Sequence, residues 1–149
     1  MKPLFKYWLP VLVWMAIIFS ASTDMGASRG TSRILRPILH WLLPDLSEQA
    51  TGQIVFLLRK TAHVTEYGIL ALLFWRALRK PAQGETRTWE WPVAGWAWAL
   101  AACYAATDEF HQSFVPSRTG ALADVLLDSA GAGIALCLWW LVGRWRKYW

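Results

Sequence analysis

Apolar residues gather in four runs along the chain, and short polar or basic clusters separate one run from the next. The runs predict helices over residues 7–22, 61–78, 92–112 and 121–143. At 1.5 Å per residue, each helix crosses most or all of a hydrocarbon core about 30 Å thick. The pattern therefore predicts one all-α domain over residues 1–149, an integral membrane four-helix bundle.

The connection between the first two runs has a different pattern. In "RILRPILHWLLPD", Arg33, Arg36 and His40 share one face of a helix, and apolar residues cover the rest of its surface. A helix of this kind lies in the plane of the membrane interface. We therefore expect an interfacial amphipathic helix here, bounded or bent by Pro37 and Pro44.

Composition supports the membrane class. The chain is 56% hydrophobic and contains 12 Trp, well above an ordinary soluble domain. Its net charge of +5 comes from residues at the ends of apolar runs and not from a basic, aromatic face, so nucleic-acid binding is not predicted. Cys103 and Cys137 lie within apolar runs without a metal-type spacing, and we expect both to be buried small hydrophobes.

The basic clusters also predict an orientation, because Lys and Arg favour the cytoplasmic side of a membrane. Four crossings place three basic clusters on one side: Lys2 and Lys6; Arg76, Arg79, Lys80 and Arg87; and Arg144, Arg146 and Lys147. Both termini are then cytoplasmic. An interfacial helix reduces, without removing, the conflict between this arrangement and the basic residues of the connection between the first two spans: Arg29, Arg33, Arg36, Arg59 and Lys60. Pro10 and Trp14 favour a retained first span over a cleaved signal sequence.

Small residues mark one face of the fourth run, in "LLDSAGAGIA". The residues of this face are Ser129, Gly131, Gly133 and Ala135. Small residues let the backbones of membrane helices approach closely. This stretch therefore predicts a packing face and not a phosphate-binding loop.

Ionisable residues converge at the other ends of the predicted spans, on the outer membrane surface. An ionised carboxylate at membrane depth costs a few kcal/mol unless it faces the bundle interior, water or a cation. Such residues are candidates for a functional site. The candidate polar pocket comprises Lys60, His63, Glu66 and Tyr67 on the second span; Asp108, Glu109, His111 and Gln112 on the third; Arg118 in the next connection; and Asp124 and Asp128 on the fourth.

Several kinds of chemistry are compatible with this set. Its histidines and carboxylates suit a divalent metal such as zinc or manganese, although no His-Glu-x-x-His spacing is present. Carboxylates beside Arg118 and a histidine would suffice for acid–base chemistry or for headgroup recognition. A third alternative is a polar network that only holds the helices together. The sequence leaves catalytic residues and cofactors open.

The order of these residues resembles the signature of the VanZ-like family of small bacterial membrane proteins. The resemblance covers nearly the whole chain and includes "FSAS" at the end of the first span. Two positions depart from the family pattern, which usually has Gly at Ser117 and Asn at Asp128. The matching residues are Lys60-x-x-His63-x-x-Glu66-Tyr67, Asp108-Glu109-x-x-Gln112-x-Phe114, Pro116-Ser117-Arg118, Asp124-Val125 and Asp128-x-x-Gly131.

The resemblance implies four transmembrane helices in the bacterial cytoplasmic membrane and a role in the cell envelope. The family's namesake is linked to low-level resistance to the glycopeptide teicoplanin, but the resemblance implies no particular reaction. We expect the polar pocket to bind or modify a lipid-linked or headgroup-bearing envelope molecule. The alternative is a structural or regulatory membrane factor without enzymatic activity. Expected partners are membrane lipids and either a lipid-linked precursor or another membrane protein.

Overall fold

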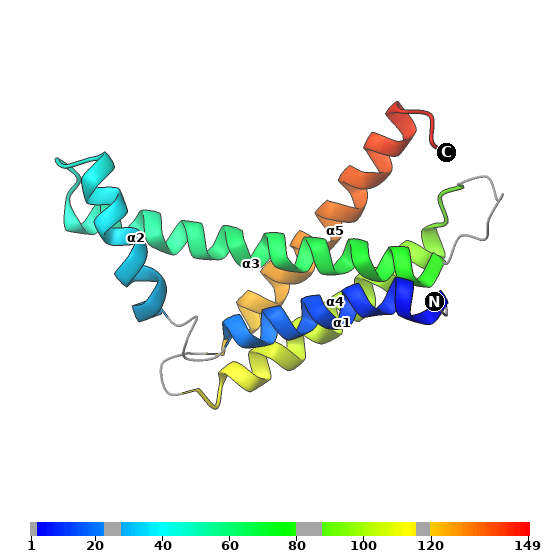
Figure 1. Ribbon diagram of the computed structural model, residues 1–149, viewed down its shortest axis with the longest axis horizontal. Helices are drawn as coiled ribbons and strands as arrows, with labels where there is room; N and C mark the ends of the chain where they lie inside the picture. Colours follow the sequence, from blue (N-terminus) through cyan, green and yellow to red (C-terminus); the bar gives the residue numbers. More distant parts are fainter. Residues whose placement is uncertain (1–2, 23–27, 80–87, 116–119) are drawn as a thin grey trace.

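A computed structural model describes residues 3–22, 28–79, 88–115 and 120–149. Those residues form five α-helices and no strand, which confirms the all-α class (Figure 1). The helices are α1 (Pro3–Ser22), α2 (Ser28–Leu42), α3 (Glu48–Arg79), α4 (Trp91–Gln112) and α5 (Leu122–Trp145).

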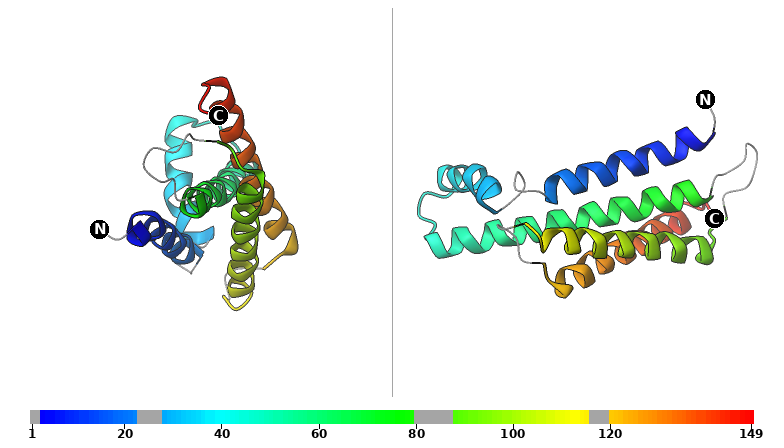
Figure 2. Two further views of the ribbon diagram at one scale, coloured as in Figure 1. Left: turned by 90° about the vertical axis from the view of Figure 1, so that its right-hand side faces the viewer. Right: turned by 90° about the horizontal axis from the view of Figure 1, so that it is seen from below.

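Helix α3 is the centre of the arrangement, and it contacts each of the other four helices. Both α1 and α4 run alongside α3 in the opposite direction, while α5 crosses α3 obliquely (Figures 1 and 2). The two chain ends lie at the end of the bundle where α3 finishes. Helix α2 lies across the opposite end, beside the first turns of α3.

The helix predicted between the first two spans is present as α2, while its position at a membrane interface stays a prediction. It includes Pro37, while Pro44 follows its last residue. Arg36 and His40 both reach Glu48 at the start of α3, with nitrogen-to-oxygen distances of 2.7 and 3.2 Å. The basic face of α2 is therefore held against the first turn of α3.

The start of α3 corrects the prediction for the second span. We expected a helix from residue 61, but α3 begins at Glu48 and runs for 32 residues. Ser47 is the N-cap of α3, because its hydroxyl accepts a hydrogen bond from the Ala50 amide at 3.2 Å. No proline interrupts the chain between Ser47 and Lys60, so the first helical turn continues directly into the predicted span.

Two of the described helices are long and apolar enough to cross a membrane by length and composition. They are α1, over Phe5–Ser22, and α5, over Leu122–Trp145. Helices α3 and α4 are not among these two candidate spans. These findings do not confirm a bundle of four membrane spans, which stays a prediction.

Small residues set the distance between α3 and α5. A Cβ atom at Gly131 would lie 2.7 Å from the Val64 carbonyl oxygen, and one at Gly68 would lie 3.1 Å from Ala135 Cβ. The packing face predicted from "LLDSAGAGIA" is therefore confirmed at Gly131 and Ala135. A Cβ at Gly133 would make ordinary contact with Trp98 at 3.6 Å, so this glycine is not required for close approach.

Both cysteines are exposed, which corrects the expectation that they are buried. Cys103 lies on the face of α4 opposite a buried row of small residues that includes Ala97, Ala101 and Ala105. Cys137 directly follows the buried Leu136 and so points away from the core. An apolar run predicts a membrane or core helix, but it does not tell which of its faces is buried.

The close approach at Gly131 generates a first prediction. Gly131→Ala should lower the free energy of unfolding by roughly 1–3 kcal/mol, because the new methyl group overlaps the α3 backbone at Val64. Thermal unfolding of the purified protein in detergent measures the effect. Gly95→Ala is the matched control, since no atom lies within 4 Å of a Cβ at Gly95. Equal stability of the two variants would contradict the close packing.

Candidate functional site

The polar side chains of α1, α3, α4 and α5 meet at the end of the bundle away from the chain termini. Ser22 ends α1, Gln112 ends α4, and Asp124 lies in the first turn of α5. Lys60 and Tyr67 reach the same region from the middle of α3. The antiparallel arrangement of the helices thus assembles most of the residues that the sequence singled out.

The Asp108 carboxylate is the centre of a buried cluster, which we call the Asp108 cluster: Ser22, Tyr67, Asp108 and Gln112. Three groups donate hydrogen bonds to Asp108 Oδ2: the Ser22 hydroxyl at 2.7 Å, the Gln112 amide at 3.0 Å and the Tyr67 hydroxyl at 3.1 Å. The Gln112 amide also lies 3.4 Å from Ser22 Oγ. These bonds connect α1, α3 and α4 through a single carboxylate oxygen.

Burial makes these hydrogen bonds important for stability. Ser22 and Tyr67 are completely buried, and Asp108 and Gln112 are almost so. Asp108 and Gln112 are four residues apart on α4, and therefore face the same way. The second carboxylate oxygen, Asp108 Oδ1, is also buried but has no hydrogen-bond partner among the described residues. A buried acceptor without a partner is costly and calls for an explanation.

A second group of charges surrounds the Lys60–Asp124 ion pair. Lys60 Nζ on α3 donates to Asp124 Oδ1 on α5, and each side chain is about 30% exposed. Glu109 is buried beside them, and its Oε1 accepts a hydrogen bond from the Ala121 amide at 2.8 Å. That amide precedes α5, so Glu109 also places a carboxylate at the positive end of this helix.

Asp128 lies one turn after Asp124 and is buried. It is within electrostatic range of Asp124, Glu109 and Lys60, and also of Asp108. Like Asp108 Oδ1, Asp128 Oδ1 has no hydrogen-bond partner in the part of the chain that the structure describes. Four carboxyl groups thus lie near one another with Lys60 among them, and two carry a buried oxygen without a partner.

The remaining candidate residues lie around this centre. His63 Nδ1 is 3.7 Å from Glu66 Oε2, which joins two residues of α3 to each other. The His111 ring lies against Phe19 on α1, with centroids 4.5 Å apart. Arg118 falls outside the described residues.

Sequence reasoning missed the contribution of α1. Ser22 was not among the candidate residues, although "FSAS" belongs to the motif that carried the family resemblance. The Trp14 indole donates to the Glu66 carbonyl oxygen at 2.9 Å, and the Tyr104 hydroxyl donates to the Met15 carbonyl oxygen at 2.7 Å. These pairs are far apart in the sequence, and spacing alone could not have matched them.

The geometry bears on two kinds of chemistry, metal binding and hydrolysis by an activated serine. No group of three or more His, Cys, Asp or Glu side chains in the described ranges is arranged to hold a metal ion. Ser22 donates to a carboxylate and not to a histidine, so it lacks the imidazole base of the usual hydrolytic arrangement. The arrangement can accept hydrogen bonds and attract positive charge.

Comparison with known proteins decides the family. The sequence matches the model of the VanZ/LLP1 family over residues 7–143. The chain belongs to the VanZ/LLP1 family. This confirms the resemblance found in the motifs, and the match covers all five helices in whole or in part. No functionally curated protein and no solved structure matches the chain.

The Asp108 cluster generates a second prediction. Asp108→Ala should destabilise this VanZ/LLP1 protein by roughly 1–3 kcal/mol, because three buried donors lose their shared acceptor. The loss should appear as a lower unfolding temperature in detergent. Thr107→Ala is the control, since the exposed Thr107 hydroxyl bonds within its own helix, to the Tyr104 carbonyl oxygen. If both variants unfold at the same temperature, the Asp108 cluster does not stabilise the fold.

Proposed function

We propose that the chain is a multi-pass protein of the bacterial cytoplasmic membrane whose polar cluster binds the headgroup of a lipid-linked envelope molecule. The polar cluster comprises the Asp108 cluster, the Lys60–Asp124 pair, Glu109 and Asp128. The cluster then lies at the outer membrane surface. The observation that carries the proposal is the pair of buried carboxylate oxygens, Asp108 Oδ1 and Asp128 Oδ1, that have no partner among the described residues. A network that served packing alone would be expected to satisfy its buried acceptors.

The charges in the cluster favour a particular ligand chemistry. Ionised carboxylates accept hydrogen bonds and cannot donate them. The charged neighbours of Asp128 are Lys60 and three carboxylates, those of Asp108, Glu109 and Asp124, so the described part of the cluster carries excess acceptors. This favours a headgroup rich in hydroxyl or ammonium donors, such as a sugar, over a bare phosphate. The partly exposed Lys60–Asp124 pair gives such a headgroup a route to the buried oxygens.

A structural role without ligand is the second candidate, and the Asp108 cluster favours it. Three hydrogen bonds to Asp108 Oδ2 join α1, α3 and α4, which is what a packing network requires. Each of the two candidate functions therefore applies to a different part of the site. Asp108 Oδ2 supports the bundle, while Asp108 Oδ1, Asp128 and the Lys60–Asp124 pair provide the binding surface.

This division can be tested by measuring membrane abundance and envelope phenotype together. Lys60→Gln and Asp124→Ala should abolish the phenotype at normal abundance, whereas Asp108→Ala should lower abundance. A deletion strain complemented with each variant provides both measurements, with glycopeptide susceptibility as one readout. Thr107→Ala is the control, because the exposed Thr107 hydroxyl bonds within its own helix, to the Tyr104 carbonyl oxygen, and the variant should preserve both. If Lys60→Gln and Asp124→Ala also lose abundance, the structural candidate replaces the binding one.

The membrane orientation has its own test, because Thr88 and Ser113 are exposed and flank α4. With the exposed Cys103 and Cys137 replaced by Ala, Ser113→Cys in intact cells should react with a membrane-impermeant maleimide. Thr88→Cys should react only after the cells are lysed. The opposite pattern would invert the orientation, and equal labelling of both sites would show that α4 does not cross the membrane.

A further inference from the structure

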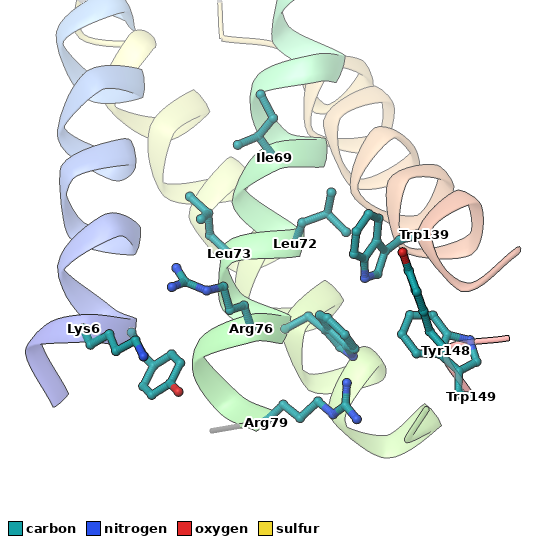
Figure 3. A pocket seen from close by; sticks show the side chains of 11 residues that line it. Lys6, Ile69, Leu72, Leu73, Arg76, Arg79, Trp139, Tyr148 and Trp149 are labelled. Carbon is teal, nitrogen blue, oxygen red and sulfur yellow. The ribbon is translucent and has the colours of Figure 1, made fainter. Parts of the chain in front are cut away.

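A second site lies at the other end of the bundle, where α3 finishes and the chain folds back after α5. A cavity of about 630 Å³ opens there between α1, α3, α5 and the segment that follows α5 (Figure 3). Its size is within the range of small-molecule binding sites. None of the residues assigned to the polar cluster lines it.

Three cationic side chains line this cavity: Lys6 from α1, and Arg76 and Arg79 from α3. Each lies over an aromatic ring, at 5.6 and 5.5 Å from the Tyr7 centroid for Lys6 and Arg76, and 5.2 Å from the Trp75 centroid for Arg79. No carboxylate pairs with any of the three within the described ranges. A guanidinium that stacks on a ring still has its in-plane N–H donors free for an anion.

The same cavity has an apolar half. Ile69, Leu72 and Leu73 share the face of α3 that carries Arg76 and Arg79, and Figure 3 shows the two kinds of side chain following one another along the helix. The five residues extend over about 15 Å of helix. The cavity therefore presents an apolar wall toward the middle of the bundle and positive charge toward its end.

Aromatic contacts hold the outer wall in place. The chain turns back after α5 through Lys147, which has a positive φ of 55°, and the Tyr148 amide bonds to the Gly143 carbonyl oxygen at 2.8 Å. The Trp149 indole then donates to the Trp140 carbonyl oxygen at 3.2 Å. Its ring lies 6.0 Å from that of Trp75, between centroids. The wall is thus built by packing and hydrogen bonds.

We infer that this cavity binds a phosphate-bearing membrane lipid, with its anionic headgroup at the end of the cavity that Lys6, Arg76 and Arg79 line and an acyl chain along Ile69, Leu72 and Leu73. Arginine donors bind phosphate oxygens through paired, charge-assisted hydrogen bonds. The apolar wall gives the acyl chain a contact that a soluble anion lacks. The site is separate from the polar cluster, where the excess charge is negative, so the two proposals stand or fall independently.

The test compares lipid binding by two pairs of substitutions in the full chain. Native mass spectrometry in detergent, with added dioleoylphosphatidylglycerol, measures the affinity. Arg76→Gln combined with Arg79→Gln should weaken binding roughly 10- to 100-fold. The control combines Arg144→Gln with Arg146→Gln, which removes the same charge near the same end from exposed residues that do not line the cavity. The control should bind like the unmodified protein.

Other ligands and one further variant make the result specific. Dioleoylphosphatidylcholine should bind more weakly than the anionic lipid, and inorganic phosphate should not compete with it. Leu72→Trp fills the apolar half and should also abolish lipid binding, with a circular dichroism spectrum unchanged from that of the parent. If the arginine pair and its control lose lipid affinity equally, the lipid does not bind in this cavity and the proposal is wrong. Effective competition by phosphate would overturn the assignment to a lipid.

Discussion

The Asp108 carboxylate is the interaction on which the rest of the bundle depends. Helices in a membrane gain little from the hydrophobic effect, because lipid tails are as apolar as the side chains they would replace. Hydrogen bonds and close packing must provide the association instead. One oxygen of Asp108 accepts from α1, α3 and α4, while Gly131 and Gly68 let α5 approach α3. Each neighbour of α3 in the bundle is thus positioned by a polar bond or by a small residue.

Because α3 is central, its sequence also distributes charge between the two ends of the bundle. Near its middle, Lys60 and Tyr67 face the carboxylates of α4 and α5. Toward its end, Arg76 and Arg79 line a cavity with no acidic side chain among the described residues of its wall. The same helix therefore provides hydrogen-bond donors for an acidic cluster at one end of the bundle and cationic side chains for a cavity at the other end. The two sites should select ligands of opposite charge.

Periodicity in the sequence predicted the elements well and the contacts between them unevenly. Helices α4 and α5 begin and end within two residues of the predicted spans 92–112 and 121–143. Tyr67, Asp108 and Gln112 were assigned to one region because antiparallel crossings bring the polar ends of the predicted spans to the same surface. The sequence could not show that Lys60 pairs with Asp124 or that Ser22 completes the Asp108 cluster, since these contacts join separate helices.

The errors have physical causes of the same kind. Hydropathy marks where a helix becomes apolar and not where it begins, so the polar turns after Ser47 were taken for a connection. An apolar run does not show which of its faces is buried, so the sequence predicted that Cys103 and Cys137 are buried, although both are exposed.

The length of α3 explains how a basic connection can lie on the outer side of the proposed membrane. Its 32 residues extend over about 48 Å, well beyond the ~30 Å hydrocarbon core. In the proposed orientation the first turns of α3 therefore project past the outer surface. There, Glu48 pairs with Arg36 and His40 of the amphipathic α2. Cations that are paired at the interface weigh less against the positive-inside rule than free ones in a loop would, so the projecting helix makes four crossings compatible with the charges of α2.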